Sequence, residues 1–303
     1  MFEFETDIEL IRQHVVELAT VPRPYGSVEL DRARAYVTGL LEGYGWAVRP
    51  HAFDVDNDAG ELQYGETLHG VNLVATRESS SPVSRSKFVV GAHLDSRPDT
   101  PGADDNASAV AALLEIARLI SQEQLASAEL ELELVAFDLE ENGMLGGREH
   151  AGLAKETGVD LFGMVSLEML GYCDSAPGSQ QLPRSLVGLY PDTGDFIAII
   201  GNQNSTELIE GFRQGAQRVP GLPVETLQVP GNGELLQATR LSDHSPFWDA
   251  GFAALMITDT SFLRNPHYHQ ETDTPETLDF DFLHRVSESC LTAVRHILAT
   301  RRM

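Results

Sequence analysis

The sequence has few cysteines, few lysines and no long apolar run. Its only cysteines are Cys173 and Cys290, and its only lysines are Lys87 and Lys155. The cysteines lie far apart in a chain with enough apolar residues for a core. We therefore expect two free thiols, as in a reducing compartment, rather than a disulfide framework. No apolar run approaches the roughly 20 residues that a membrane helix needs, so we expect no membrane span.

Positive charge is also scarce. The chain has 21 lysine and arginine residues against 46 aspartate and glutamate residues, which gives a formal net charge of -25. Such a charge repels a phosphate backbone, so we expect no nucleic-acid partner. The N-terminal segment MFEFETDIELIRQ lacks the basic start and apolar stretch of a signal peptide. We expect a cytoplasmic protein, although a secreted mature form fits the same sequence, and the oligomeric state stays open.

Apolar periodicity predicts alternating strands and helices. Strand-like apolar runs cover 71–76, 88–92, 130–137, 164–167, 196–200 and 253–258. Helical periodicity covers 5–20, 28–45, 106–121, 146–155, 205–218 and about 280–300. This alternation predicts an α/β fold, a three-layer sandwich with a mixed, mostly parallel central sheet and helices on both faces. No internal repeat or low-complexity linker divides the chain, so we expect a single domain over 1–303.

Two polar stretches interrupt the pattern. The segment ESSSPVSRS, 78–86, predicts a turn between two strands. The stretch 172–195 is long and rich in Gly, Pro, Ser and Asp. A loop of that length inside a compact domain is usually functional or mobile. Because it directly follows the acidic candidate Glu168, we expect it to form a rim of the active site.

Histidine and carboxylate side chains gather after the apolar run 88–92. His93, Asp95, Asp104 and Asp105 follow that run closely. Strand ends at one edge of an open α/β sheet bind ligands, and imidazole with carboxylate suits a divalent metal such as zinc. In an extended chain His93 and Asp95 point the same way, so Asp95 could accept the second ring N–H of a metal-bound His93. Taken alone, each segment is better explained without a metal, His93 and Asp95 as a plain strand end, and Asp104 and Asp105 as a helix cap.

Two further strand ends carry carboxylates. Glu140 and Glu141 follow the apolar run 130–137. Adjacent carboxylates can divide the work, since one can bind a metal while its neighbour takes a proton from water. Glu168 interrupts an otherwise apolar run. A carboxylate buried there needs a partner, either a metal or an arginine.

The segment 265–274, NPHYHQETDT, supplies further histidines. His269 and Asp273 repeat the histidine–carboxylate pairing seen at His93 and Asp95. Periodicity does not choose between His267 and His269 as the ligand. Together the segments supply what two zinc ions need: one bridging carboxylate, plus one histidine and one carboxylate each.

Five ordered blocks between about residues 70 and 280 make the sequence recognisable. They are GAHLDS, GADDNAS, DLEENGMLGGREHA, LSDHSPFWDAGFAALMITDT and YHQETDTPETLD. The chain resembles the co-catalytic dizinc aminopeptidase family, which includes bacterial leucyl and Streptomyces-type aminopeptidases and relatives of glutamate carboxypeptidase II. The resemblance implies the zinc exopeptidase fold and hydrolysis of the N-terminal bond of a peptide, or of a small amide. Gly147 stands where the family usually has serine.

The resemblance also implies the metal ligands. It implies that one zinc ion is bound by His93, Asp105 and Glu168. It implies that the other is bound by Asp105, Glu141 and His269, so that Asp105 bridges the two. Other divalent metals are compatible with the same ligands.

The resemblance implies the remaining roles as well. Glu140 would be the general base, Asp95 would orient His93, and Tyr268 would donate to the oxyanion. Asp104 would not be a ligand, and the block with Asp243 and His244 would shape the site without binding metal. In relatives the peptide bond after the bridging aspartate is cis, so we expect a cis bond between Asp105 and Asn106.

Three alternatives to an aminopeptidase stay open: a carboxypeptidase or deacylase, a glutaminyl cyclase, and a non-catalytic binding module. The first follows from Glu168, because many aminopeptidases of the family have aspartate there and glutamate is associated with carboxypeptidases and deacylases. Glutaminyl cyclases use the same scaffold with one zinc ion, but commonly have tryptophan before the last histidine and lack the first one; this chain has Tyr268 and His93. A non-catalytic binding module would have lost ligands, whereas every ligand position is filled here.

Overall fold

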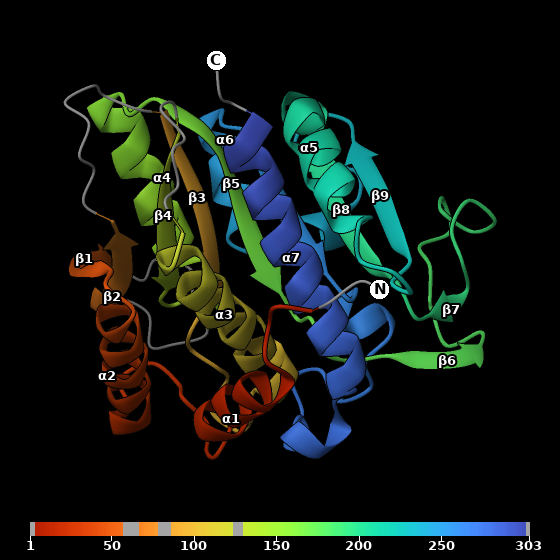
Figure 1. Cartoon of the computed structure of the whole chain (residues 1–303), viewed down its shortest axis with the longest axis horizontal. Helices are drawn as coiled ribbons and strands as arrows, with labels where there is room; N and C mark the ends of the chain where they lie inside the picture. Colours follow the sequence, from red (N-terminus) through yellow and green to blue (C-terminus); the bar gives the residue numbers. More distant parts are fainter. Residues whose placement is uncertain (1–3, 57–66, 78–85, 124–129, 301–303) are drawn as a thin grey trace.

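The computed structural model describes residues 4–56, 67–77, 86–123 and 130–300. In this part of the chain, eight strands form one sheet in the order β1-β2-β4-β3-β5-β10-β8-β9 (Figure 1). They are β1 (Ala47–Asp56), β2 (Thr67–Thr76), β3 (Ser86–His93), β4 (Leu130–Phe137), β5 (Leu161–Glu168), β8 (Ile197–Asn202), β9 (Val224–Val229) and β10 (Ala254–Thr258). Strand β3 pairs in parallel with β4 and β5, as do β5 with β10 and β8 with β9. The other three neighbouring pairs are antiparallel. The expected mixed, mostly parallel sheet is confirmed.

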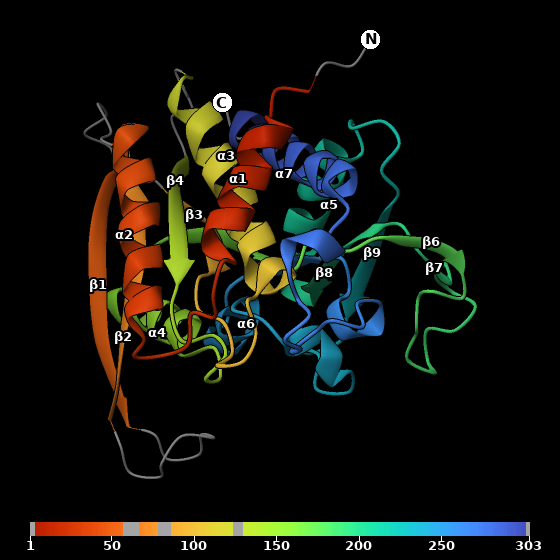
Figure 2. The ribbon, with the colours of Figure 1, turned by 90° about the horizontal axis from the view of Figure 1, so that it is seen from below.

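Helices cover both faces of the sheet (Figure 2). One face carries α1 (Ile8–Leu18), α2 (Val28–Gly43), α3 (Ala109–Ser121), α5 (Thr206–Ala216) and α7 (Phe280–Thr300). The other face carries α4 (Leu145–Thr157) and α6 (His244–Ala250). The three-layer arrangement predicted from the sequence is therefore present. Among the described helices, none combines the length and the apolar composition that a membrane span requires.

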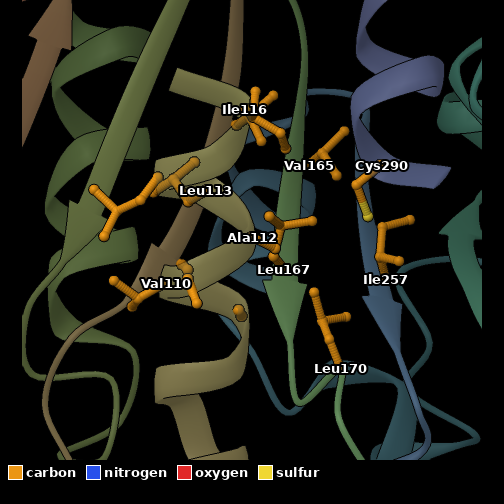
Figure 3. Packing of buried hydrophobic residues seen from close by; sticks show 14 of the residues in the cluster. Val110, Ala112, Leu113, Ile116, Val165, Leu167, Leu170, Ile257 and Cys290 are labelled. Atoms are coloured by element: carbon orange, nitrogen blue, oxygen red, sulfur yellow. The ribbon is translucent and has the colours of Figure 1, made fainter. Parts of the chain in front are cut away.

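The strands are apolar on both faces because each face meets helices. Val89 packs toward α4 and α6, while its neighbour Val90 packs toward the five-helix layer. This follows from the alternation of side chains along a strand. Figure 3 shows the five-helix side, where residues of α3, β5 and β10 meet Cys290 of α7. Cys290 is fully buried, and both cysteines are free thiols, as expected.

The strands at the two edges of the sheet were not predicted from the sequence. Most residues of β1 and β9 are exposed or half-buried, so their sequences contain no apolar run. The short helix α6 and the small hairpin of β6 (Asp174–Pro177) and β7 (Thr193–Gly194) were also missed. The turn predicted at 78–86 lies almost entirely outside the described residues, since β3 begins at Ser86.

Candidate metal centre and active site

Four neighbouring strands end at the same edge of the sheet and carry the site. His93 is the last residue of β3, and Glu168 is the last residue of β5. The turn after β4 carries Glu140 and Glu141, and the segment after β10 carries His269. Because β3, β4, β5 and β10 are parallel, their carboxyl ends meet at one edge, where open α/β sheets bind ligands.

The two carboxylate oxygens of Asp105 face two different imidazoles. Oδ1 lies 3.2 Å from Nε2 of His93, and Oδ2 lies 3.3 Å from Nε2 of His269. Oε2 of Glu168 lies 3.6 Å from the same His93 nitrogen. Oε2 of Glu141 lies 3.4 Å from the His269 nitrogen. In each of these two groups the candidate ligand atoms all lie within 4.8 Å of one another.

These donor groups fit a divalent metal ion. His93 is buried, and its Nε2 makes no hydrogen bond with any described residue although it faces carboxylate oxygens. Oε1 of Glu141 is buried and lacks a hydrogen-bond partner within the same described part of the chain. Imidazole nitrogen and carboxylate oxygen are ligands that zinc prefers. A bound cation would also offset the repulsion between carboxylates that point into one small space.

Asp95 connects the first histidine to the paired glutamates. Nδ1 of His93 makes a hydrogen bond of 3.1 Å to the backbone oxygen of Asp95 and lies 3.5 Å from its carboxylate. The carboxylate itself accepts hydrogen bonds from the backbone N–H groups of Glu140 and Glu141. Asp95 therefore fixes the turn that carries both glutamates as well as the ring of His93.

Asp273 plays a different part from the one its sequence pairing with His269 suggests. Its carboxylate accepts hydrogen bonds from the backbone N–H groups of Asp104 and Asp105, at 2.9 and 3.1 Å. Asp273 therefore ties the segment that carries His269 to the turn that carries Asp105.

Glu140 lies between the candidate metal ligands and an apolar cavity, which is described below. Its Oε2 is 4.0 Å from Nε2 of His93, and its side chain lines that cavity. Burial raises the pKa of the Glu140 carboxyl well above its ordinary value; His93 opposes this effect and Glu168 adds to it. The site thus holds a carboxylate with raised proton affinity beside the candidate ligands.

Tyr268 stacks on the candidate ligand that follows it. The rings of Tyr268 and His269 lie 3.7 Å apart at an interplanar angle of 21°. Burial and the nearby Asp105 carboxylate raise the pKa of the Tyr268 hydroxyl, so it stays protonated and able to donate a hydrogen bond. The side chain also lines the pocket.

Glu168 reaches the cluster with support from two serines. Ser242 donates a hydrogen bond of 2.8 Å to Oε2 of Glu168, and the hydroxyls of Ser242 and Ser166 lie 2.8 Å apart. The side chain of Glu168, which is one methylene longer than that of aspartate, is therefore held toward His93. Ser242 belongs to the block LSDHSP, but its contact with Glu168 was not predicted, because the two residues lie 74 positions apart.

Two nearby candidates point away from the cluster. The Asp104 carboxylate accepts hydrogen bonds from the Gly171 backbone N–H and the Asn265 side-chain amide. Nδ1 of His267 pairs with the Thr272 hydroxyl at 2.8 Å, so His269 alone of the two histidines joins the cluster. The peptide bond from Asp105 to the next residue is cis, as expected.

The glycine at position 147 is explained by packing. A Cβ atom at Gly147 would lie 2.6 Å from Oδ1 and 3.0 Å from Cβ of Asp243, which is fully buried. Real Cβ atoms essentially never lie as close as 2.6 Å to another atom, so a serine here would require the Asp243 side chain to move. Asp243 and His244 are both fully buried and do not belong to either candidate ligand group.

An apolar cavity of about 250 Å³ opens next to the cluster. Glu140, Glu141, Glu168 and Tyr268 line its polar end. Its apolar wall comes from β8, β10, β9 and the 172–195 segment, and includes Leu182, Leu186, Ala198, Ile200, Leu227 and Met256. The Tyr190 hydroxyl donates a hydrogen bond of 2.8 Å to the Thr226 backbone oxygen of β9. The long loop thus forms one side of the pocket.

This combination defines a class of protein. A mixed α/β sheet that gathers imidazoles, carboxylates and a general-base candidate beside a substrate-sized pocket is typical of metal-dependent hydrolases. Comparison with known proteins narrows the class. The model of peptidase family M28 matches residues 72–294, and the chain belongs to this family.

Relatives and solved structures agree with the family. The chain is 37% identical to the uncharacterized protein YfbL of Escherichia coli (strain K12), over 89% of this chain and 82% of that protein. It is 29% identical to leucine aminopeptidase 1 of Trichophyton equinum, over 76% of this chain and only 60% of that enzyme. BSAP, a zinc aminopeptidase from Bacillus subtilis, shares the fold with a TM-score of 0.75, 14% identity and coverage of 98% and 96%. Porphyromonas gingivalis glutaminyl cyclase shares it with a TM-score of 0.72, 18% identity and coverage of 97% and 99%.

Proposed function

We propose that the chain is a zinc-dependent aminopeptidase that works with two metal ions. The observation that carries this proposal is Asp105, whose two carboxylate oxygens each face a different imidazole at 3.2 and 3.3 Å. A carboxylate placed in this way suits a ligand shared by two ions. The relatives include a leucine aminopeptidase and a probable zinc metalloprotease, which supports the same kind of reaction.

In this proposal the two ligand groups of the cluster hold one ion each. His93, Asp105 and Glu168 hold the first, and Asp105, Glu141 and His269 hold the second. Bound zinc supplies Lewis acidity, which lowers the pKa of a water molecule and polarises the scissile carbonyl.

The chain's own residues carry the proton and stabilise the developing charge. Glu140 takes a proton from the attacking water and passes it to the leaving amine. The protonated hydroxyl of Tyr268 donates a hydrogen bond to the oxyanion. The Asp95 carboxylate holds Glu140 in place by accepting a hydrogen bond from the Glu140 backbone N–H.

The surroundings of the site favour a substrate with a free N-terminus. The carboxylates at the polar end of the cavity suit an ammonium group, and the apolar wall suits a hydrophobic first side chain. Arg97 also lines the cavity, but its Nη1 lies 3.8 Å from Oε2 of Glu141. A guanidinium that already faces a carboxylate is poorly placed to anchor the C-terminal carboxylate of a substrate.

Two modified peptides test which end of the substrate is recognised. A leucyl peptide with an amidated C-terminus should be hydrolysed, and the same peptide with an acetylated N-terminus should not. The reverse result would favour a carboxypeptidase anchored at Arg97. One bound zinc ion per chain, with conversion of N-terminal glutamine to a cyclic product and ammonia, would favour the glutaminyl cyclase alternative.

A further inference from the structure

An arginine outside every recognised block lies buried beneath the metal cluster. Arg23 belongs to the connection between α1 and α2 and is only 2% exposed. Its guanidinium donates four hydrogen bonds of 2.5 to 3.2 Å, all to backbone oxygens, namely those of Leu18, Leu94, Pro101 and Gly102. Position 23 also precedes the region that matches the family model, which begins at residue 72.

Three of these acceptors lie in the loop that joins the first histidine to the shared aspartate. Leu94 follows His93 directly, and Gly102 lies three residues before Asp105. The guanidinium therefore holds both ends of the loop at once. The backbone of Arg23 also holds Ser96 of this loop, because the Arg23 N–H donates to Ser96 Oγ and the Arg23 oxygen accepts from the Ser96 N–H.

The fit around the guanidinium is close. Gly102 has a φ of +69°, in the left-handed region that favours glycine. A Cβ atom there would lie 2.3 Å from the backbone oxygen of Asp105 and 3.1 Å from Nη2 of Arg23. The turn before Asp105 is thus packed directly against the arginine.

Two side chains of opposite charge hold this loop, and each binds a different kind of backbone group. Arg23 binds carbonyl oxygens, whereas Asp273 accepts from the N–H groups of Asp104 and Asp105. All four acceptors of the guanidinium named above are uncharged carbonyls, so its positive charge can act on the buried carboxylates around it, which include Asp95. Burial lowers the pKa of Arg23 to about 10, which leaves the side chain charged at neutral pH.

We propose that Arg23 is a positioning residue of the metal centre. It sets the separation of His93 and Asp105 by holding the loop between them, and it acts on zinc only through these ligands. The inference rests on the proposed function, since it concerns how tightly the same site binds zinc.

Lysine separates the geometry of Arg23 from its charge. A guanidinium presents five N–H donors in a rigid fork, whereas an ammonium group is a compact point charge with three donors. Arg23→Lys therefore keeps the charge but cannot span the four carbonyls. We expect its zinc dissociation constant, measured by competition with a chromogenic chelator, to rise about 10- to 100-fold, as for other residues that orient metal ligands. In zinc-saturated enzyme, we expect kcat to fall and KM to change little. The substitution displaces the metal ligands but leaves the apolar cavity, which would bind the substrate, unchanged.

Arg77→Lys is the matched control. Arg77 also donates to backbone oxygens, those of Ile120 and Glu123, but at the far end of α3, about 20 Å from the site. We expect this variant to lose thermal stability without a change in zinc affinity. If Arg23→Lys lowers Tm as the control does but binds zinc as wild type, the inference is overturned while the proposed function stands.

A second variant covers the case in which Arg23→Lys does not fold. Ser96→Ala removes the hydroxyl that accepts from the Arg23 backbone and loosens the same loop. It should weaken zinc binding severalfold, and wild-type zinc affinity in this variant would overturn the inference. A wild-type protein that binds no zinc would instead overturn the proposed function, and this inference with it.

Discussion

At the scale of single residues, the adjacent glutamates face different partners. Oε2 of Glu141 lies 3.4 Å from Nε2 of His269, whereas Oε2 of Glu140 lies 4.0 Å from Nε2 of His93. Asp95 fixes this division because it binds the backbone N–H groups of both glutamates. Adjacent carboxylates held in this way suit separate roles, one in metal binding and one in proton transfer.

Glu140→Gln should separate metal binding from turnover. Glutamine has the same shape but cannot take a proton from water, so we expect kcat to fall 10²- to 10⁴-fold. Zinc content should stay near that of wild type, because Glu140 belongs to neither candidate ligand group. Steady-state kinetics with elemental analysis measures both quantities. Retention of more than about a third of kcat would show that another group acts as the base.

Asp105→Asn should disturb both metal ions. Each of its oxygens faces a different histidine, so the loss of one anionic ligand weakens both positions. We expect zinc content to fall to one ion per chain or fewer, as measured by elemental analysis after dialysis. The matched control is Asp104→Asn, since Asp104 is equally buried but bonds to Gly171 and Asn265. Equal loss of zinc from both variants would contradict the bridging role.

The candidate ligands could be predicted because each follows an apolar strand or belongs to a recognised block. The choice between His267 and His269 could not be made from periodicity, because the segment is a turn and His269 has a φ of +56°. The contacts of Arg23 and Asp273 could not be predicted from the sequence either. Apart from the bond of Arg23 to the Leu18 oxygen, these contacts reach backbone groups that are 71 to 169 positions away, and no local pattern encodes them.

At the scale of elements, burial decides which strands a sequence reveals. The strands β3, β4 and β5 lie inside the sheet and are buried on both faces, so their apolar runs predict them directly. The edge strands β1 and β9 are mostly exposed or half-buried and lack that pattern. The predicted fold was correct because the central strands and their helices determine the architecture, and the edge strands only extend it.

The 172–195 loop should control which substrates fit. Leu186 lines the cavity, so Leu186→Ala removes part of its apolar wall. We expect kcat/KM for leucyl substrates to fall about 5- to 20-fold, while alanyl substrates, which do not reach that wall, are little affected. The neighbouring Val187 is 66% exposed and outside the cavity lining, so Val187→Ala serves as the control. Equal losses for leucyl and alanyl substrates would show that Leu186 does not contact the first side chain.

At the scale of the whole molecule, negative charge is concentrated where the proposed metals bind. The chain carries a formal net charge of -25. The buried carboxyl residues near the cluster include Asp95, Asp104, Asp105, Glu168, Asp243, Asp259 and Asp273. Carboxylates buried close together repel one another, and this repulsion lowers the stability of the folded chain unless cations offset it. Zinc in the cluster would therefore contribute to folding stability as well as to catalysis.

Removal of metal should lower the thermal stability of the protein. A ligand that binds only the folded state contributes RT ln(1 + [L]/Kd), which is about 4 kcal/mol at a thousandfold excess over Kd. We expect chelation to lower Tm by several degrees and added zinc to restore it, as measured by calorimetry. Asp105→Asn should show little response to either treatment, because it lacks the shared ligand. An unchanged Tm in wild-type protein that has verifiably lost its zinc would contradict this prediction, because it would mean that zinc does not bind the folded state in preference to the unfolded chain.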